Sequence, residues 1–182
     1  MFIRAAFSLP KADRYIFVCR SDQLKKGSVE SIVQKHFPDS IIHYIDRLAD
    51  GQAASCMSAR DYIPDDAILT IGPSDSAMIY LQEQWDEFLA NNDKEAIIWT
   101  IRGHQSMLEK PQMYGWVKAD EKSGKVSLVS CKKTVSEHPD TDPGIMGCFS
   151  FKRAADFFSA VERMMSLNDR INGELYVDIA MN

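Results

Sequence analysis

Residues 67–75 of the chain read AILTIGPSD, and this stretch decides the fold class. The apolar run over residues 67–71 is short and continuous, which is typical of a β-strand buried on both faces. Gly72, Pro73, Ser74 and Asp75 follow it directly and form a polar turn. The stretch therefore predicts a buried strand with an acidic residue just beyond its carboxyl end.

Similar strands lie on both sides of this stretch. Apolar runs predict strands over residues 15–19, 41–45 and 96–101. Between them, apolar residues at helical spacing predict helices over 24–37, 51–62 and 78–89. Strand and helix alternate regularly as far as residue 101, so the sequence predicts an α/β fold with a mostly parallel sheet covered by helices on both faces.

The second half of the chain changes character. Residues 114–119 and 125–132 predict two strands of a hairpin, and residues 145–151 predict another buried strand. An amphipathic helix is expected over 154–165, and a further helix from residue 174 to the end of the chain. Because no repeat or linker interrupts the pattern, we expect a single domain over residues 1–182.

Composition and charge exclude several classes of protein. The 182 residues include 21 Lys or Arg and 26 Asp or Glu, which gives a formal net charge of −5 without basic runs, so a nucleic-acid partner is not expected. The apolar runs are too short for a membrane-spanning helix. The four cysteines and four histidines are scattered and indicate neither a zinc site nor a disulfide framework, which favours a cytoplasmic location.

Polar groups follow the second predicted strand at Asp50-Gly51-Gln52-Ala53. Glycine permits a close backbone approach, and the N-terminus of a helix offers N–H donors to an anion. The alternative is an ordinary helix start with Asp50 as its N-cap. Spacing alone leaves both interpretations open.

Asp75 is the second candidate, because it follows the third predicted strand. A carboxylate in that position can hold Mg²⁺, which binds one or two carboxylates and completes its shell with water and substrate phosphates. The alternative is that Asp75 merely caps the helix predicted to follow. Both interpretations again remain open.

Taken together, the ordered segments resemble the sugar-phosphate nucleotidyltransferase family, and in particular its members from surface-polysaccharide gene clusters. The resemblance runs from about Arg14 onward and rests on the order and spacing of six segments: Asp50–Ala53, Gly72–Asp75, Tyr114-Gly115-Trp116, Val129–Lys133, Gly147–Phe151 and Asn172–Asp178. It implies a Rossmann-like three-layer sandwich of the nucleotide-diphospho-sugar transferase type. It also implies transfer of a nucleoside monophosphate from an NTP to a sugar 1-phosphate, with Mg²⁺ as cofactor.

The resemblance assigns roles to individual residues. Asp75 matches the family's catalytic, metal-binding aspartate, and Gly51, Gln52 and Ala53 match the nucleotide-binding segment. Gly115 matches a glycine that contacts the sugar. Lys133 matches a catalytic lysine near the sugar phosphate, and Glu174 matches an acid that holds sugar hydroxyls. These residue types suit the chemistry, since a flexible ammonium binds a phosphate dianion and a carboxylate accepts bonds from hydroxyls.

The chain departs from the family at both ends and within one motif. It starts after the family's glycine-rich loop and stops before its C-terminal part, and Lys132 and Thr134 stand where Glu and Pro are usual. Because the missing loop binds the triphosphate, we expect weak activity or none. The missing first strand would leave two sheet edges unpaired, which favours rearrangement or a homo-oligomer.

Two other functions remain open. One is a glycosyltransferase of the same fold, in which Asp75 would hold a metal ion bound to a nucleotide sugar. The other is a non-catalytic module for sugar-phosphate binding or assembly. Among minor candidates, Arg102-Gly103-His104 follows a predicted strand, and Trp116 suits either the sugar site or cross-strand packing.

Overall fold

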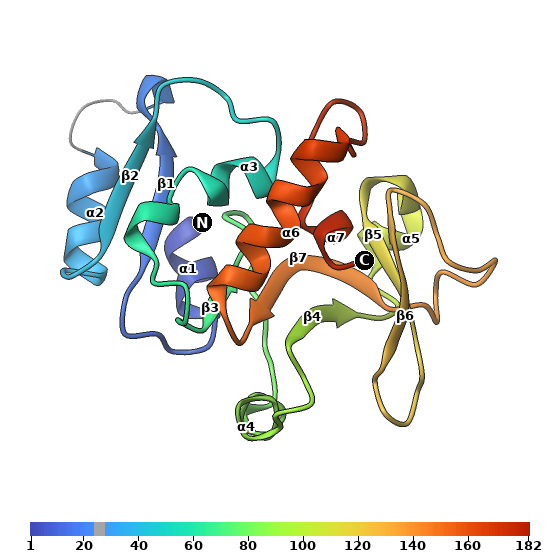
Figure 1. Cartoon of the computed structure of the whole chain (residues 1–182). Helices are drawn as coiled ribbons and strands as arrows, with labels where there is room; N and C mark the ends of the chain where they lie inside the picture. The colour runs from blue at the N-terminus through green and yellow to red at the C-terminus, as the bar shows by residue number, and fades with distance from the viewer. Residues whose placement is uncertain (24–27) are drawn as a thin grey trace.

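The computed structural model describes residues 1–23 and 28–182. In chain order, the helices and strands alternate through the first half and give way to strands and then helices in the second (Figure 1): α1 Phe2–Phe7, β1 Ile16–Arg20, η1 Ser21–Gln23, α2 Ser28–His36, β2 Ile41–Ile45, α3 Gln52–Met57, η2 Arg60–Tyr62, β3 Leu69–Ile71, α4 Gln82–Ala90, β4 Ala96–Ile101, α5 Gln105–Glu109, η3 Pro111–Met113, β5 Gly115–Ala119, β6 Val126–Cys131, β7 Gly144–Phe151, α6 Ala154–Leu167 and α7 Val177–Ala180.

The strands form two sheets. β1 and β2 pair in parallel, from Ile16 opposite Ile41 to Arg20 opposite Ile45. The other five strands form a sheet in which β7 pairs with β3, β4 and β5, and β5 pairs with β6. Every pairing in this second sheet is antiparallel. The mixed α/β class is therefore confirmed, but the expected mostly parallel sheet is wrong.

The position of β7 explains the difference. Phe151 lies opposite Leu69 of β3 and also opposite Ala96 of β4, so β7 runs between these two strands. β3 and β4 consequently point the same way, as strand–helix–strand units require, but an antiparallel strand separates them. Local periodicity carries no information about such an insertion, because β7 comes almost fifty residues later in the chain.

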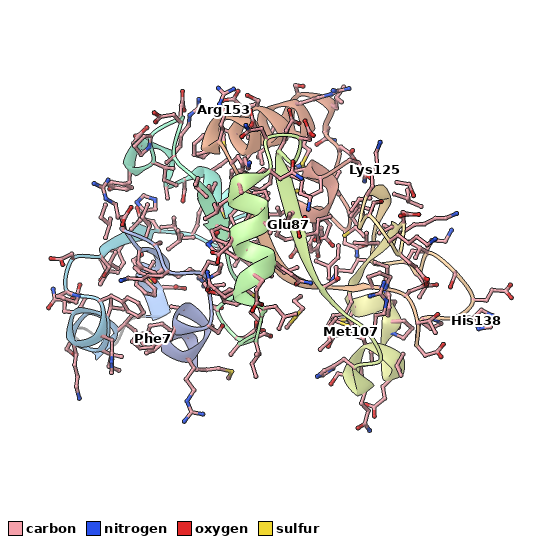
Figure 2. The ribbon with its side chains drawn as sticks, turned by 90° about the horizontal axis from the view of Figure 1, so that it is seen from below. Phe7, Glu87, Met107, Lys125, His138 and Arg153 are labelled. Carbon is pink, nitrogen blue, oxygen red and sulfur yellow. The ribbon has the colours of Figure 1, made fainter. Side chains whose placement is uncertain are left out.

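The two faces of the five-stranded sheet bury different side chains. Phe149 and Phe151 face α6, where Phe151 contacts Phe157 with ring centroids 5.4 Å apart. Figure 1 shows α6 lying along β7. On the opposite face, Trp99 of β4 lies 6.1 Å from Trp85 of α4. Figure 2 shows α4, which carries Glu87, beside β4 on that face. This alternation follows from the two-residue period of a strand.

Ser150 joins three strands on the α4 face. Its side chain is fully buried and accepts a hydrogen bond of 3.0 Å from Trp99 Nε1, and its Oγ lies 2.9 Å from Thr70 Oγ1. Buried polar groups of this kind are stable only when they are paired. The cluster links β3, β4 and β7 in the middle of the sheet.

The N-terminal helix α1 lies between β1 and β3 (Figure 1). It packs with α2 and the two-stranded sheet in a second apolar cluster, centred on Ala6, Val33 and Phe37. At its end, Leu9 contacts Gly72, and Ser8 Oγ accepts a 3.0 Å hydrogen bond from Met78 N. Among the described residues, no strand pairing joins β1 to β3.

Three predicted helices differ from those in the structure, and the predicted start of a fourth lies outside the described residues. The helix expected over 51–62 is divided into α3, Gln52–Met57, and the 3-10 turn η2, Arg60–Tyr62. The helix expected over 78–89 begins only at Gln82, after an irregular segment. The helix expected from residue 174 is limited to Val177–Ala180. The helix expected over 24–37 begins within residues 24–27, which lie outside the described residues. None of the described helices is long and apolar enough to cross a membrane.

Candidate functional site

Two loops that lie more than 120 residues apart in the chain are bonded to each other. Leu175 N donates a 2.7 Å hydrogen bond to Asp50 O, and Ala53 N donates a 3.1 Å hydrogen bond to Leu175 O. The predicted nucleotide-binding segment, Gly51–Ala53, thus lies beside Glu174, the predicted sugar ligand. The structure brings these two parts of the expected site together.

Gly51 permits this contact. Its φ is +97°, and a Cβ placed on it would lie 2.5 Å from Leu175 O. Any other residue would suffer both backbone strain and a clash with the backbone of the second loop. The glycine is therefore required by the approach of the two loops, whether or not a ligand binds there.

The same contacts correct two expectations for this segment. The N-cap of α3 is Gly51, without a side-chain cap, so Asp50 does not cap the helix. The Asp50 carboxylate instead accepts a 3.0 Å hydrogen bond from Arg170 Nη1. The Ala53 amide is bonded to Leu175 O, so it is not free for an anion as the anion-binding interpretation assumed.

Gly147 of β7 links this segment to the Asp75 turn. Gln52 Nε2 donates a 3.0 Å hydrogen bond to Gly147 O, and a Cβ placed on Gly147 would lie 3.7 Å from Pro73. Asp75 itself is exposed, and its Oδ1 accepts a 3.3 Å hydrogen bond from Ser76. Because the next helix begins at Gln82, Asp75 does not cap it, and that alternative is wrong.

A small, shallow crevice adjoins the Asp75 turn. It is lined by Ser8, Leu9, Pro73, Ser76, Met78, Met146 and Cys148. It leaves essentially no room for a water-sized molecule, whereas ordinary ligand pockets enclose ~300–1,000 Å³. The N-terminal segment thus fills much of the space at the carboxyl end of β3.

Asp178 lies over Gly115 on the other side of the Glu174 loop. A Cβ placed on Gly115 would be 2.0 Å from Asp178 Oδ2, so only glycine fits under this carboxylate. Asp178 is only 8% exposed. Burial raises its pKa, although the positive charge of Lys132 opposes the shift.

Lys132 enters the same cluster. Its Nζ donates a 2.6 Å hydrogen bond to Met113 O and lies 5.0 Å from the centroid of the Tyr176 ring. The Tyr176 hydroxyl donates to the Glu174 carboxylate. Burial, together with that hydrogen bond, raises the pKa of Tyr176, so the hydroxyl remains a donor at neutral pH.

Cys131 completes the cluster at the end of β6. Burial, reinforced by the negative charge of Asp178, raises the pKa of its thiol to about 12. A thiol with so high a pKa is protonated at neutral pH and is a poor nucleophile. Cys131 is therefore a packing residue of the cluster, not a reactive group.

Lys133 lies apart from these contacts. It is exposed, whereas Lys132, which has a φ of +62°, directs its side chain to Tyr176. In the part of the chain that the structure describes, Asp75, Lys133 and Glu174 form no hydrogen bond or ion pair with one another. The structure thus joins Glu174 to Gly51–Ala53, but makes no direct contact between Glu174 and either Asp75 or Lys133.

Sequence reasoning missed four residues of this cluster: Cys131, Lys132, Tyr176 and Asp178. All four belong to segments that carried the family resemblance, yet only Lys133 and Glu174 received roles. Strand alternation could not have separated Lys132 from Lys133, because β6 ends at Cys131 and Lys132 has a positive φ of 62°.

The described residues contain no group of three or more His, Cys, Asp or Glu side chains that could hold a metal ion by themselves. Asp75 nevertheless fits a Mg²⁺ ion that arrives with a nucleotide. It offers one exposed carboxylate, and Mg²⁺ commonly takes one or two carboxylates together with water and phosphate oxygens. Ser76, at 3.3 Å, orients that carboxylate.

The minor candidates have structural roles or lie at the periphery. Trp116 is 1% exposed and donates a 2.9 Å hydrogen bond to Pro111 O, which favours the packing interpretation. Arg102 Nε donates to Thr141 O and holds the long loop before β7. His138 lies on that loop at the edge of the molecule (Figure 2).

Comparison with solved structures shows what the fold resembles. The inositol-1-phosphate CTP transferase from T. maritima superposes with a TM-score of 0.60 and 11% identity, over 92% of this chain and 60% of the other. HddC from Yersinia pseudotuberculosis superposes with a TM-score of 0.53 and 14% identity, over 91% of this chain and 63% of HddC. The structure of HddC complexed with GMP-PN superposes with a TM-score of 0.51 and 14% identity, over 90% of this chain and 62% of HddC.

The sequence matches no protein-family profile and no curated protein. The chain spans about three-fifths of the length of the solved structures that it resembles. At 11–14% identity the likeness concerns the fold alone. Its mixed α/β architecture is similar to that of the inositol-1-phosphate CTP transferase, in agreement with the resemblance found in the sequence.

Proposed function

We propose that the chain is a nucleotidyltransferase-type domain that binds an NTP with Mg²⁺ and a sugar 1-phosphate. The observation that carries this proposal is the pair of backbone hydrogen bonds between Leu175 and the Asp50–Ala53 loop. They place the segment assigned to the nucleotide next to the segment assigned to the sugar. The fold shared with the CTP transferase supports the same proposal.

In the reaction proposed, a phosphate oxygen of the sugar 1-phosphate attacks the α-phosphorus of the NTP. The bond from that phosphorus to the bridging oxygen breaks, and pyrophosphate leaves. Mg²⁺, when bound, would neutralise charge on the phosphates. Asp75 would hold the ion, Lys133 would bind the sugar phosphate, and Glu174 and Gly115 would orient the sugar.

Activity of the isolated chain is proposed to be weak or absent. Leu9 contacts Gly72 and Ser8 Oγ accepts a hydrogen bond from Met78 N, so these residues occupy space beside the Asp75 turn where the triphosphate would form charge-assisted hydrogen bonds. Charge-assisted hydrogen bonds to phosphates contribute about 1.5–3 kcal/mol each. The loss of two or three such bonds amounts to ~10²-fold or more in rate.

The small crevice beside Asp75 favours a second candidate, a non-catalytic module that binds sugar phosphates or assists assembly. Under either function, we propose a single domain in the cytoplasm that is able to self-associate. For the nucleotidyltransferase, we also propose a role in the synthesis of surface-polysaccharide precursors.

Thermal denaturation with ligands tests the proposal. Ligand that binds only the native state raises stability by RT ln(1 + [L]/Kd). We expect Mg²⁺ with CTP or GTP to raise the Tm, inositol 1-phosphate or glucose 1-phosphate to raise it separately, and Asp75→Asn to abolish only the first effect. A rise in Tm with sugar phosphate alone would favour the non-catalytic module. A rise with UDP- or GDP-sugars but not with NTPs would favour a glycosyltransferase. No rise with any of these ligands would contradict the nucleotidyltransferase, the module and the glycosyltransferase alike.

A further inference from the structure

Arg170 bridges the two loops of the candidate site. Its Nη1 donates hydrogen bonds of 3.0 Å to Asp50 Oδ2 and 2.9 Å to Gly173 O, and its Nε donates one of 3.1 Å to Asn168 Oδ1. The first bond joins the loop over residues 168–174 to the Asp50 loop, and the other two lie within the 168–174 loop. One guanidinium therefore both shapes the loop and anchors it.

The loop needs such support because its backbone is unusual. Asn168, Asn172 and Gly173 all have positive φ values, of 51°, 52° and 83°. Asn and Gly tolerate this region, but three such residues among six leave little regular hydrogen bonding to hold the path of the chain. Hydrogen bonds between Ile171 and Glu174 close the turn.

Glu174 lies between two anchors. On one side, Arg170 pairs with the Asp50 carboxylate, and on the other, Leu175 is bonded to Asp50 O and Ala53 N. The position of Glu174 relative to Gly51–Ala53 therefore depends on both attachments.

We propose that Arg170 is a positioning residue that couples the nucleotide segment to the sugar segment. The identity of the two ligands rests on the proposed function, but the coupling of the two loops does not. The Asp50 side chain is 64% exposed, so the ion pair adds little to global stability. Its effect is local order at Glu174 and Ala53.

Hydrogen–deuterium exchange of the whole chain tests the coupling. In Arg170→Ala we expect exchange on the order of threefold to tenfold faster in peptides that contain Ala53 and in peptides that contain Leu175, with α6 unchanged. Arg153→Ala is the matched control, because Arg153 pairs with Asp156 at 4.0 Å on the surface of α6. That control should leave both loops unchanged.

Two further variants separate positioning from general damage. Arg170→Lys keeps the cation and should restore most of the protection around Ala53. Asp50→Ala breaks the bridge from the other loop and should speed exchange around Leu175, and it serves as the test if Arg170→Ala does not fold. Faster exchange confined to residues 168–173, or none at all, would overturn the proposal.

A second experiment, on ligand binding, distinguishes failure of this proposal from failure of the proposed function. If CTP with Mg²⁺ tightens the binding of inositol 1-phosphate, Arg170→Ala should reduce that tightening severalfold while each ligand alone still binds. Unchanged tightening would overturn the coupling. If neither ligand binds the natural chain, the proposed function fails, and the exchange experiment alone decides on Arg170.

Discussion

The carboxylate of Asp178 lies against the backbone of Gly115, so closely that a Cβ on Gly115 would be 2.0 Å from Asp178 Oδ2. This contact brings the short helix α7 onto strand β5. Gly115 thus has a packing role besides the sugar contact implied by the family resemblance.

Gly115→Ala should lower the free energy of unfolding by about 1–3 kcal/mol, because the new methyl group has to displace a buried carboxylate. Urea denaturation measures the change. Gly124→Ala is the control, since no atom lies within 4 Å of its Cβ and only its φ of +69° opposes the substitution. Equal losses at the two glycines would contradict the packing role.

Asp178 should make stability depend on pH. Burial raises its pKa above the usual 3.8, so the folded state holds the proton more tightly than the unfolded state. Stability therefore falls as the pH rises from 3.8 through the raised pKa. Asp178→Asn removes this titration. Over that pH range, the unfolding free energy of the natural chain should therefore fall relative to that of Asp178→Asn. A shift in favour of the natural chain would contradict the assignment.

Much of the fold follows from local patterns. The strand at Ala96–Ile101 has the predicted bounds, because a run of six apolar or β-branched residues with polar flanks marks a buried strand clearly. The place of β7 between β3 and β4 was not predictable, since pairing depends on contacts between distant segments. The helix expected to start at Met78 is replaced there by an irregular segment, because the Met78 amide donates its hydrogen bond to Ser8 Oγ.

Gly51 and Gly173 offer a matched pair, because both have positive φ values but differ in their surroundings. At Gly51 a Cβ would meet Leu175 O at 2.5 Å, whereas at Gly173 no atom lies within 4 Å. Gly51→Ala should lower the unfolding free energy by about 2–4 kcal/mol, through strain and a backbone clash. Gly173→Ala should cost only about 1 kcal/mol. Chemical denaturation compares them, and a larger loss at Gly173 would contradict the close contact of the loops.

The site was predictable only in part. Family motifs identified both Gly51 and Glu174, and the structure places their segments in contact. Spacing along the chain did not reveal that Asp50 pairs with Arg170, since the partner is 120 residues away. Nor did it show which of two adjacent lysines faces Tyr176.

The two lysines should respond differently to substitution. Lys132→Ala removes the bond to Met113 O and the contact with the Tyr176 ring, and should lower the unfolding free energy by about 1–2 kcal/mol. Lys133→Ala should change stability by less than about 0.5 kcal/mol, because the residue is exposed, yet should weaken sugar-phosphate binding. Denaturation and calorimetric titration measure the two effects. A loss of stability in Lys133→Ala together with a loss of sugar-phosphate binding in Lys132→Ala would contradict this assignment.

The proposed function requires that Asp75, Lys133 and Glu174 border one ligand site. Titration followed by NMR tests this most directly. CTP with Mg²⁺ should shift the backbone amides of residues 51–53 and 75, and inositol 1-phosphate or glucose 1-phosphate should shift those of residues 115, 133 and 174. Amide shifts on unrelated surfaces, or no shifts at millimolar ligand, would contradict it.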